Sequence, residues 1–134
     1  MGKGRWINVV ITGAAGGLGI EIAKQTLERN DNVWAFDIKK NLKIEELEDS
    51  EYSDNLHFFE CDISSTEDVA NKLKVLKNCI TEIDEIYNCA GFIRPQDRVP
   101  LEETDLDAIA KVVDINAVGF LRIIKELLPL INAQ

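Results

Sequence analysis

The sequence predicts an α/β fold in which a doubly wound parallel sheet of about four strands carries helices on both faces. Two observations predict it. Short apolar runs alternate with amphipathic helical patterns in the order β-α-β-α-β-α-β-α, which is typical of parallel strands joined by right-handed crossovers. The first apolar run, residues 7–11, is also nearly continuous, as expected of a strand that is covered on both faces.

The first half of the chain supplies two strands and two helices. After the strand at residues 7–11, residues 17–30 are expected to form a helix, because apolar positions recur there at helical spacing. Residues 33–36 predict a second buried strand that ends at Asp37. The charged segment 39–49 predicts a short helix followed by a surface loop.

The second half continues the alternation. A third strand is expected at residues 56–59, a helix with a capping box at residues 65–80, and a fourth strand at residues 85–88. A long apolar helical pattern then runs from about 104 to 131, with a distortion expected near Pro129. These elements predict a Rossmann-type layer with strand order 3-2-1-4, in which ligands bind beyond the carboxyl ends of strands 1 and 4.

The composition limits the number of domains and the kinds of partner. The 134 residues allow a single domain, 1–134, and 46% of them are hydrophobic, which suffices for a core. With 15 basic and 24 acidic residues, the formal net charge is −9, which disfavours nucleic acid as a partner. No apolar stretch reaches the roughly 18–20 residues of a spanning helix, so no membrane partner is expected.

The cysteine spacing and the first 15 residues indicate the cellular compartment in which the protein is expected. The chain has three cysteines (Cys61, Cys79 and Cys89) without CxxC spacing, which disfavours both a disulfide framework and a zinc site. Residues 1–15 lack the apolar region and cleavage site of a signal peptide. We therefore expect a cytoplasmic protein without a metal site.

A glycine-rich segment, TGAAGGLG at residues 12–19, follows the first strand directly. Glycine permits positive φ and lets a phosphate approach the backbone closely. The helix that starts near Gly17 directs free N–H groups and its positive dipole end at the same space. A pyrophosphate is therefore the expected occupant, and a flexible turn without a ligand is the alternative.

This segment and four later ones resemble motifs of the short-chain dehydrogenase/reductase family. The matching residues are Thr12 with Gly13, Gly17 and Gly19; Asp37 at the end of strand 2; Cys61-Asp62-Ile63 after strand 3; Asn88-Cys89-Ala90-Gly91, which looks like the family's NNAG motif with Cys for the second Asn; and Asp114-Ile115-Asn116 in the long helix. The resemblance implies an oxidoreductase that transfers hydride between a nicotinamide cofactor and an alcohol or carbonyl substrate.

The resemblance also implies a choice of cofactor. Asp37 would accept hydrogen bonds from both hydroxyls of the adenosine ribose and would repel a 2′-phosphate, so NAD is expected in preference to NADP. Ile38 and Gly16 stand where NADP-preferring relatives often carry a basic residue. Lys39 and Lys40 are close enough to offset part of the repulsion. A solvated carboxylate at a strand end is the alternative for Asp37.

Further roles follow from the same resemblance. Asp62 would bond the adenine amino group with Ile63 beside the ring, unless Asp62 is simply an acid at a helix start. Asn88 would tie strand 4 to its neighbours, and Asn116 would hold a kinked helix and position a water for proton relay, unless it is an ordinary mid-helix polar residue. The expected cofactor-binding residues are Gly13, Ala15, Gly16, Gly17, Leu18, Gly19, Asp37, Ile38, Asp62, Ile63, Asn88, Ala90 and Gly91.

The family's catalytic residues do not appear in this chain. The family uses a Ser together with Tyr and Lys in a YxxxK pattern, but Tyr52 and Tyr87 are followed four residues later by Leu56 and Gly91. We therefore expect the chain to be the N-terminal, cofactor-binding half of such an enzyme and inactive alone. A non-catalytic dinucleotide-binding or interaction module is the alternative.

The end of the chain predicts self-association. Residues 120–131 are apolar around much of the helix circumference, unlike an ordinary surface helix. In the family this helix commonly packs against its copy in another subunit, and strand 4 would present an open edge. We expect a homo-oligomer through the last helix, the edge of strand 4, or both. A monomer in which the C-terminal helix refolds over the exposed edge of strand 4 is the alternative.

Overall fold

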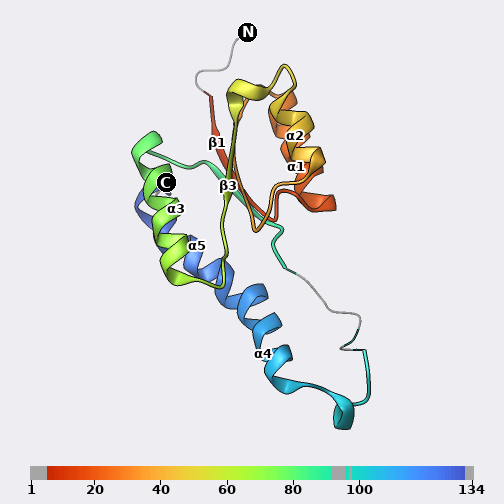
Figure 1. Ribbon diagram of the computed structural model, residues 1–134. Helices are drawn as coiled ribbons and strands as arrows, with labels where there is room; N and C mark the ends of the chain where they lie inside the picture. Colours follow the sequence, from red (N-terminus) through yellow and green to blue (C-terminus); the bar gives the residue numbers. More distant parts are fainter. Residues whose placement is uncertain (1–5, 92–95, 97, 132–134) are drawn as a thin grey trace.

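The computed structural model confirms the parallel sheet (Figure 1). It describes residues 6–91, 96 and 98–131. Its four strands lie in the order β3-β2-β1-β4 and are all parallel, as the alternating pattern predicts. The strands are β1 (Asn8–Thr12), β2 (Asn32–Asp37), β3 (Leu56–Glu60) and β4 (Glu85–Asn88).

Helices cover both faces of this sheet (Figure 1). The pair α1 and α2 packs on one face, and α3 packs with α5 on the other. The helices are α1 (Gly17–Glu28), α2 (Leu42–Glu48), α3 (Thr66–Cys79), α4 (Leu106–Val113) and α5 (Gly119–Leu127). Short 3-10 turns occupy Ser53–Asn55, Leu101–Glu103 and Leu128–Leu130.

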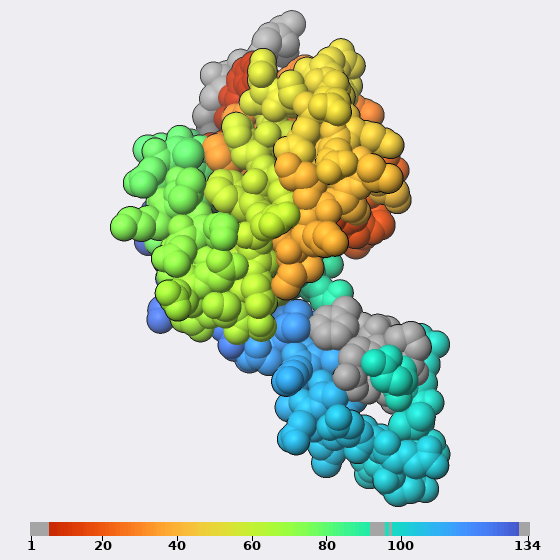
Figure 2. Space-filling view, viewed as in Figure 1, coloured from red at the N-terminus to blue at the C-terminus, as the bar shows by residue number. Residues whose placement is uncertain are grey.

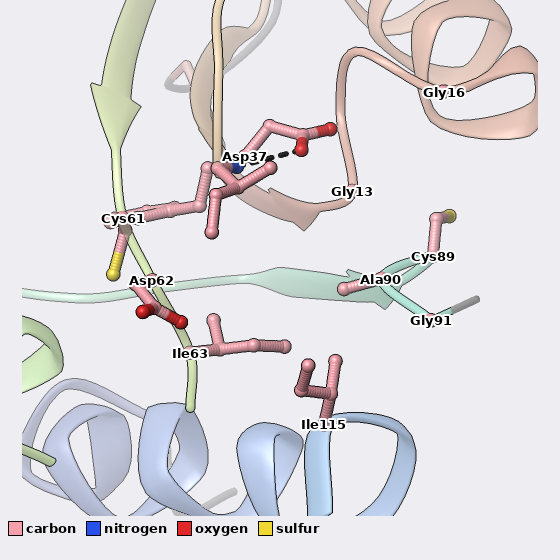
Figure 3. Close-up of a pocket in the computed structure, with 12 residues that line it drawn as sticks. Gly13, Gly16, Asp37, Cys61, Asp62, Ile63, Cys89, Ala90, Gly91 and Ile115 are labelled. Atoms are coloured by element: carbon pink, nitrogen blue, oxygen red, sulfur yellow. Dashed lines mark hydrogen bonds between the residues drawn. The ribbon is translucent and has the colours of Figure 1, made fainter. Parts of the chain in front are cut away.

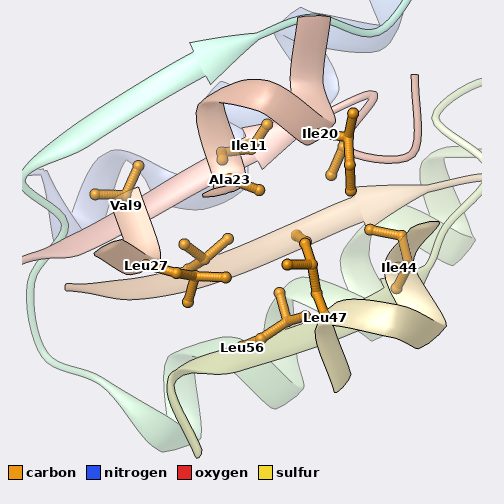
Figure 4. Packing of buried hydrophobic residues seen from close by; sticks show 11 residues of the cluster. Val9, Ile11, Ile20, Ala23, Leu27, Ile44, Leu47 and Leu56 are labelled. Atoms are coloured by element: carbon orange, nitrogen blue, oxygen red, sulfur yellow. The ribbon is translucent and has the colours of Figure 1, made fainter. Parts of the chain in front are cut away.

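Two hydrophobic cores lie on opposite faces of the sheet, and β1 contributes residues to both. Val9 and Ile11 of β1 face α1, where they pack with Ala23 and Leu27 (Figure 4). Val10, between them, belongs to the core formed with α3 and α5. Because successive strand residues point to opposite faces, a strand between two helical layers needs apolar residues at every position, which explains the continuous run.

Three helices begin at a side chain that accepts hydrogen bonds from their first turn. Asn41 caps α2, Ser65 caps α3 and Asp105 caps α4. The capping box expected for α3 is only half formed. Ser65 accepts from the Asp68 amide, but the Asp68 carboxylate accepts from the Asp62 amide at 2.7 Å instead of returning to Ser65.

The single long helix expected at the end of the chain is interrupted. A π-helical turn, Asp114–Val118, separates α4 from α5, and the 3-10 turn that contains Pro129 ends α5. The distortion expected near Pro129 is therefore present, and a larger one that the periodicity did not predict lies at Asp114–Val118. No residue of α4 is buried, and this helix extends away from the sheet (Figure 2).

The outer side of β4 forms one edge of the sheet among the described residues. Its other side pairs with β1 from Val9↔Glu85 to Thr12↔Asn88. On the outer side, the Ile83 amide donates to the Leu130 carbonyl at 2.7 Å, and Ile83 forms a parallel bridge with Ile131. Within the described part of the chain, no helix is long and apolar enough to cross a membrane.

Candidate functional site

A cleft of about 390 Å³ opens at the carboxyl ends of the strands (Figure 3). The parallel register places the ends of β1, β2 and β4 side by side, with Thr12 opposite both Phe36 and Asn88. The loops that leave these strands therefore converge on one space. The cleft is lined by Gly13, Gly16, Phe36, Asp37, Ile38, Cys61, Asp62, Ile63, Cys89, Ala90, Gly91 and Ile115.

The glycine turn needs two of its glycines for packing. Gly13 has a φ of +67°, and a Cβ there would lie 2.5 Å from the backbone nitrogen of Ala90. A Cβ on Gly19 would collide with the Gly13 carbonyl oxygen. Gly17 differs from both, because a Cβ there would meet no atom within 4 Å. Open space at Gly17 leaves its backbone accessible to a bound group.

The start of α1 has the character of an anion site. Gly16 is its N-cap and offers no side-chain hydrogen bond, and the first turn holds no acidic residue. The first N–H groups of a helix lack intrahelical partners and carry partial positive charge. A phosphate fits this position, whereas Asn41, Ser65 and Asp105 already cap the other three helices that leave loops.

Asp37 joins the glycine turn to the end of β2. Its carboxylate accepts hydrogen bonds from the Ala15 amide at 2.9 Å and from the Ile38 amide at 2.7 Å. Asn41 supports the same turn, because its side-chain amide donates to the Ala15 carbonyl at 2.8 Å. The carboxylate is thus fixed at the cleft, and its remaining lone pairs are suited to accept from hydroxyl groups.

The loop after β3 presents Asp62 and Ile63 to the cleft. One carboxylate oxygen of Asp62 accepts from both the amide (2.9 Å) and the hydroxyl (2.6 Å) of Ser64. Asp68 holds the backbone of this loop through the Asp62 amide. That hydrogen bond, together with one from Lys72, lowers the pKa of Asp68 below its ordinary value, so the carboxylate stays charged.

Thr12 fastens the end of β4. The Thr12 hydroxyl donates to the Asn88 side-chain oxygen at 2.7 Å and accepts from the Ala90 amide at 3.3 Å. Asn88 therefore ties strand 4 to strand 1. Gly91 lies against Asn116, since a Cβ on this glycine would be 3.0 Å from the Asn116 side-chain oxygen.

Most of the expected cofactor residues converge at the cleft, and several residues were missed. Eight line it: Gly13, Gly16, Asp37, Ile38, Asp62, Ile63, Ala90 and Gly91. The remaining expected residues do not line the cleft: Ala15 in the glycine turn, Gly17, Leu18 and Gly19 in the first turn of α1, Asn88 at the end of β4 and Asn116 in the π turn. The sequence analysis did not assign Phe36, Cys61, Cys89 or Ile115 to the site, although each directly adjoins a residue that it did assign.

The cysteines of the cleft are not activated nucleophiles. Burial raises the pKa of Cys61 to about 12, and burial also raises the pKa of Cys89. Both thiols therefore stay protonated near neutral pH. Within the described residues, no group of three His, Cys, Asp or Glu side chains is placed to hold a metal ion.

Neither tyrosine of the chain is among the described residues that line the cleft. The Tyr87 hydroxyl donates to a Glu85 carboxylate oxygen at 3.3 Å, and Tyr52 packs against the core beside α2. The described cleft thus holds residues suited to binding but no phenol suited to proton transfer.

Solved structures share this fold. A short chain dehydrogenase from Leptospira borgpetersenii with bound NAD+ superposes with a TM-score of 0.77 at 21% identity, over 92% of this chain and 45% of that one. The protein ElxO with NADP bound gives a TM-score of 0.79 at 24% identity, over 92% of this chain and 50% of that one. These similarities show the fold, and the two structures carry different dinucleotides.

Curated relatives are similar in sequence as well. An uncharacterized oxidoreductase of Saccharomyces cerevisiae is 30% identical over 115 residues, covering 86% of this chain and 35% of the relative. The 17-beta-hydroxysteroid dehydrogenase 13 of Mus musculus is 29% identical over 123 residues, covering 90% of this chain and 39% of that relative. The chain thus spans less than half the length of these relatives. The family model described as short chain dehydrogenase matches residues 7–134, so the chain belongs to the short-chain dehydrogenase/reductase family of oxidoreductases.

Proposed function

We propose that the chain is the dinucleotide-binding portion of an NAD-dependent oxidoreductase that acts on an alcohol or carbonyl substrate. The observation that carries this proposal is the position of Asp37, held at the cleft by the amide of Ala15, which lies two residues before the uncapped start of α1 at Gly17. A carboxylate for ribose hydroxyls and a helix start for the pyrophosphate are the two recognition elements that an adenosine dinucleotide requires.

Two residues near Asp37, Lys40 and Ile38, support NAD over NADP. Of the two neighbouring lysines, Lys40 forms an ion pair with Glu48 at 2.8 Å and lies over the Phe58 ring. It is therefore engaged away from the position that a 2′-phosphate would occupy. Ile38, which is exposed at the cleft, carries no charge to compensate for Asp37.

The residues of this chain would bind and orient the cofactor. The amides that follow Gly16 would hold the pyrophosphate, and Asp62 with Ile63 would hold the adenine. Ala90 and Gly91 would let a ribose lie against the backbone. When bound, the nicotinamide supplies or accepts the hydride, and the residues of this chain would hold the adenine, ribose and pyrophosphate of the cofactor.

A non-catalytic dinucleotide-binding or interaction module is the alternative function. It rests on the absence of YxxxK from the 134 residues. A Ser and a YxxxK pattern elsewhere in the natural polypeptide would favour the enzyme, and their absence would favour the module. All three cysteines are free, which supports the reducing cytoplasm as its location.

We also propose that the chain forms a homo-oligomer through α4 and α5. An exposed apolar stripe, defined by Leu106, Val113, Leu121 and Leu128, follows these helices. The spacings are seven, eight and seven residues, and the extra residue coincides with the π turn, which keeps the stripe on one face. Helical stripes of this kind normally pack against another apolar surface.

Calorimetric titration of the chain with NAD and with NADP tests the cofactor assignment. We expect tighter binding of NAD, and a reduced or reversed preference in Asp37→Ala combined with Ile38→Arg. The single variant Ile38→Ala is the matched control and should keep the preference. Equal or tighter binding of NADP by the unmodified chain would refute the assignment.

A further inference from the structure

Arg122 of α5 joins three segments that surround one end of the cleft. Its guanidinium binds both carboxylate oxygens of Asp114, at 2.9 and 3.0 Å. It also donates to the Ile63 carbonyl at 2.9 Å and to the Thr66 hydroxyl at 3.1 Å. Its side chain is only 18% exposed. A forked, partly buried guanidinium with four such bonds restricts all of its partners geometrically.

The pair depends on the π turn. Residues eight apart in a regular α-helix are offset by about 80° around the axis. The extra residue of the turn Asp114–Val118 gives this pair the phase of an α-helical i, i+7 pair, whose offset is only about 20°. The ion pair therefore bridges the turn from its first residue to the helix beyond. Asp114 stays charged there, because Arg122 lowers its pKa.

Two of the three segments held by Arg122 contribute a residue to the same end of the cleft. The Ile63 carbonyl belongs to the loop after β3, and Ile115 immediately follows Asp114; both isoleucines line the cleft. Figure 3 shows their side chains directed toward one another at the same end. Gly119 completes the arrangement, because any Cβ there would lie 2.8 Å from the Ile63 side chain.

We propose that Arg122 is a positioning residue for the adenosine end of the dinucleotide site. By holding the segments that carry Ile63 and Ile115, Arg122 fixes the separation of these two side chains and thereby the width available to the adenine ring. This proposal rests on the proposed function. Arg122 does not line the cleft, so it acts through the residues that it holds.

The test compares Arg122→Met with a control that removes a similar ion pair elsewhere. Lys77 of α3 pairs with Glu126 of α5 at 2.7 Å, so Lys77→Met removes a contact between the same two helices without touching a residue of the cleft. AMP and NAD are titrated by calorimetry into the unmodified chain and both variants. The methyl resonances of Ile63 and Ile115 are recorded by NMR in each.

We expect Arg122→Met to weaken AMP and NAD by the same factor, about tenfold or about 1.4 kcal/mol of binding free energy, because the Ile63 loop and the π turn lose the group that joins them. The two methyl resonances should shift or broaden in that variant. Lys77→Met should change neither affinity nor resonances. Unchanged affinity in Arg122→Met, or equal losses in both variants, would overturn the proposal.

Two further outcomes are kept separate. If Arg122→Met does not fold, Asp114→Asn replaces it, because that variant removes the charge pair and leaves the bond from Arg122 to Ile63. A loss of AMP affinity smaller than tenfold in Asp114→Asn supports the proposal. Unchanged AMP affinity in Asp114→Asn overturns it. If the unmodified chain binds neither AMP nor NAD, the proposed function fails. The methyl resonances then decide on the role of Arg122 by themselves.

Discussion

Gly17 and Gly19 lie in one turn, yet their surroundings predict opposite effects of substitution. Gly17→Val adds a side chain to open space at the start of α1, so the fold should persist while the approach of a pyrophosphate is blocked. We expect NAD binding to fall below detection by calorimetry, with a change in the free energy of unfolding within about 0.5 kcal/mol.

Gly19→Val is the contrasting variant. Its Cβ would collide with the Gly13 carbonyl, so the turn must move and the protein should lose several kcal/mol of stability. Unchanged NAD binding by Gly17→Val would refute the assignment of the phosphate position, whereas full stability of Gly19→Val would show that the turn is less constrained than its geometry indicates.

His57 makes stability depend on pH. Its ring stacks on Trp34 with centroids 4.0 Å apart, and burial lowers its pKa from 6.5. The unfolded chain therefore binds the proton more readily, so this contribution to stability is complete above pH 6.5 and is lost as the pH falls toward the lower folded-state pKa. Urea unfolding at a series of pH values measures it.

The matched variant is His57→Gln, which keeps a polar side chain but cannot titrate. It should lack the decline in stability that the unmodified chain shows as the pH falls below 6.5. A decline of equal size in the variant would assign the effect to another group.

The sequence could predict site residues that carry a motif but not those that arrive by packing. Gly13, Asp37 and Asp62 each follow a strand, and parallel strand ends must meet. Ile115 lines the cleft from within the π turn, which joins it to residues distant in the sequence, and it carries no motif of its own. Asn41 was also missed, since its bond to the Ala15 carbonyl joins segments 26 residues apart.

At the scale of elements, strand and helix order could be read from the sequence because burial on two faces imposes simple periodicities. Boundaries moved by one or two residues: α1, expected to reach residue 30, ends at Glu28. The π turn was missed because both flanking segments are apolar at helical spacing. The change of phase between Val113 and Leu121, eight residues apart, was the available signal.

The exposed stripe gives a prediction about association. Leu121 is 61% exposed, whereas Leu127 is fully buried against α3 and the sheet. Leu127 is therefore a core residue, although it lies within the apolar segment 120–131 from which the interface was expected. We expect Leu121→Glu to convert an oligomer into a soluble monomer by light scattering, without a change in melting temperature measured on the dissociated chain.

Leu127→Glu should instead unfold the chain, because an unpaired carboxylate in a core typically lowers stability by more than about 3 kcal/mol. A stable monomer of the unmodified chain at micromolar concentration would contradict the interface. So would an oligomer that Leu121→Glu leaves intact.

At the scale of the whole molecule, binding without chemistry is expected of these 134 residues. No tyrosine lies among the described lining residues, and a general acid typically contributes ~10²–10⁴-fold to such a reaction. We expect no NADH formation above a cofactor-only control when the chain is supplied with mixed alcohols. Turnover that Asn116→Ala abolishes would show that the proton-transfer group had been overlooked.

The bond between Thr12 and Asn88 has a consequence for the time course of folding. It joins two residues that are 76 positions apart in the sequence. The pairing of β1 with β2 joins residues that are only 24 positions apart, such as Asn8 and Asn32. Closing the longer loop costs about 1 kcal/mol more in chain entropy, so β4 should dock after β2. The part of the cleft formed by the residues after β4, Cys89, Ala90 and Gly91, would then be the last to assemble. In refolding experiments the fluorescence of Trp34 should recover before the ability to bind NAD; simultaneous recovery would indicate one concerted step.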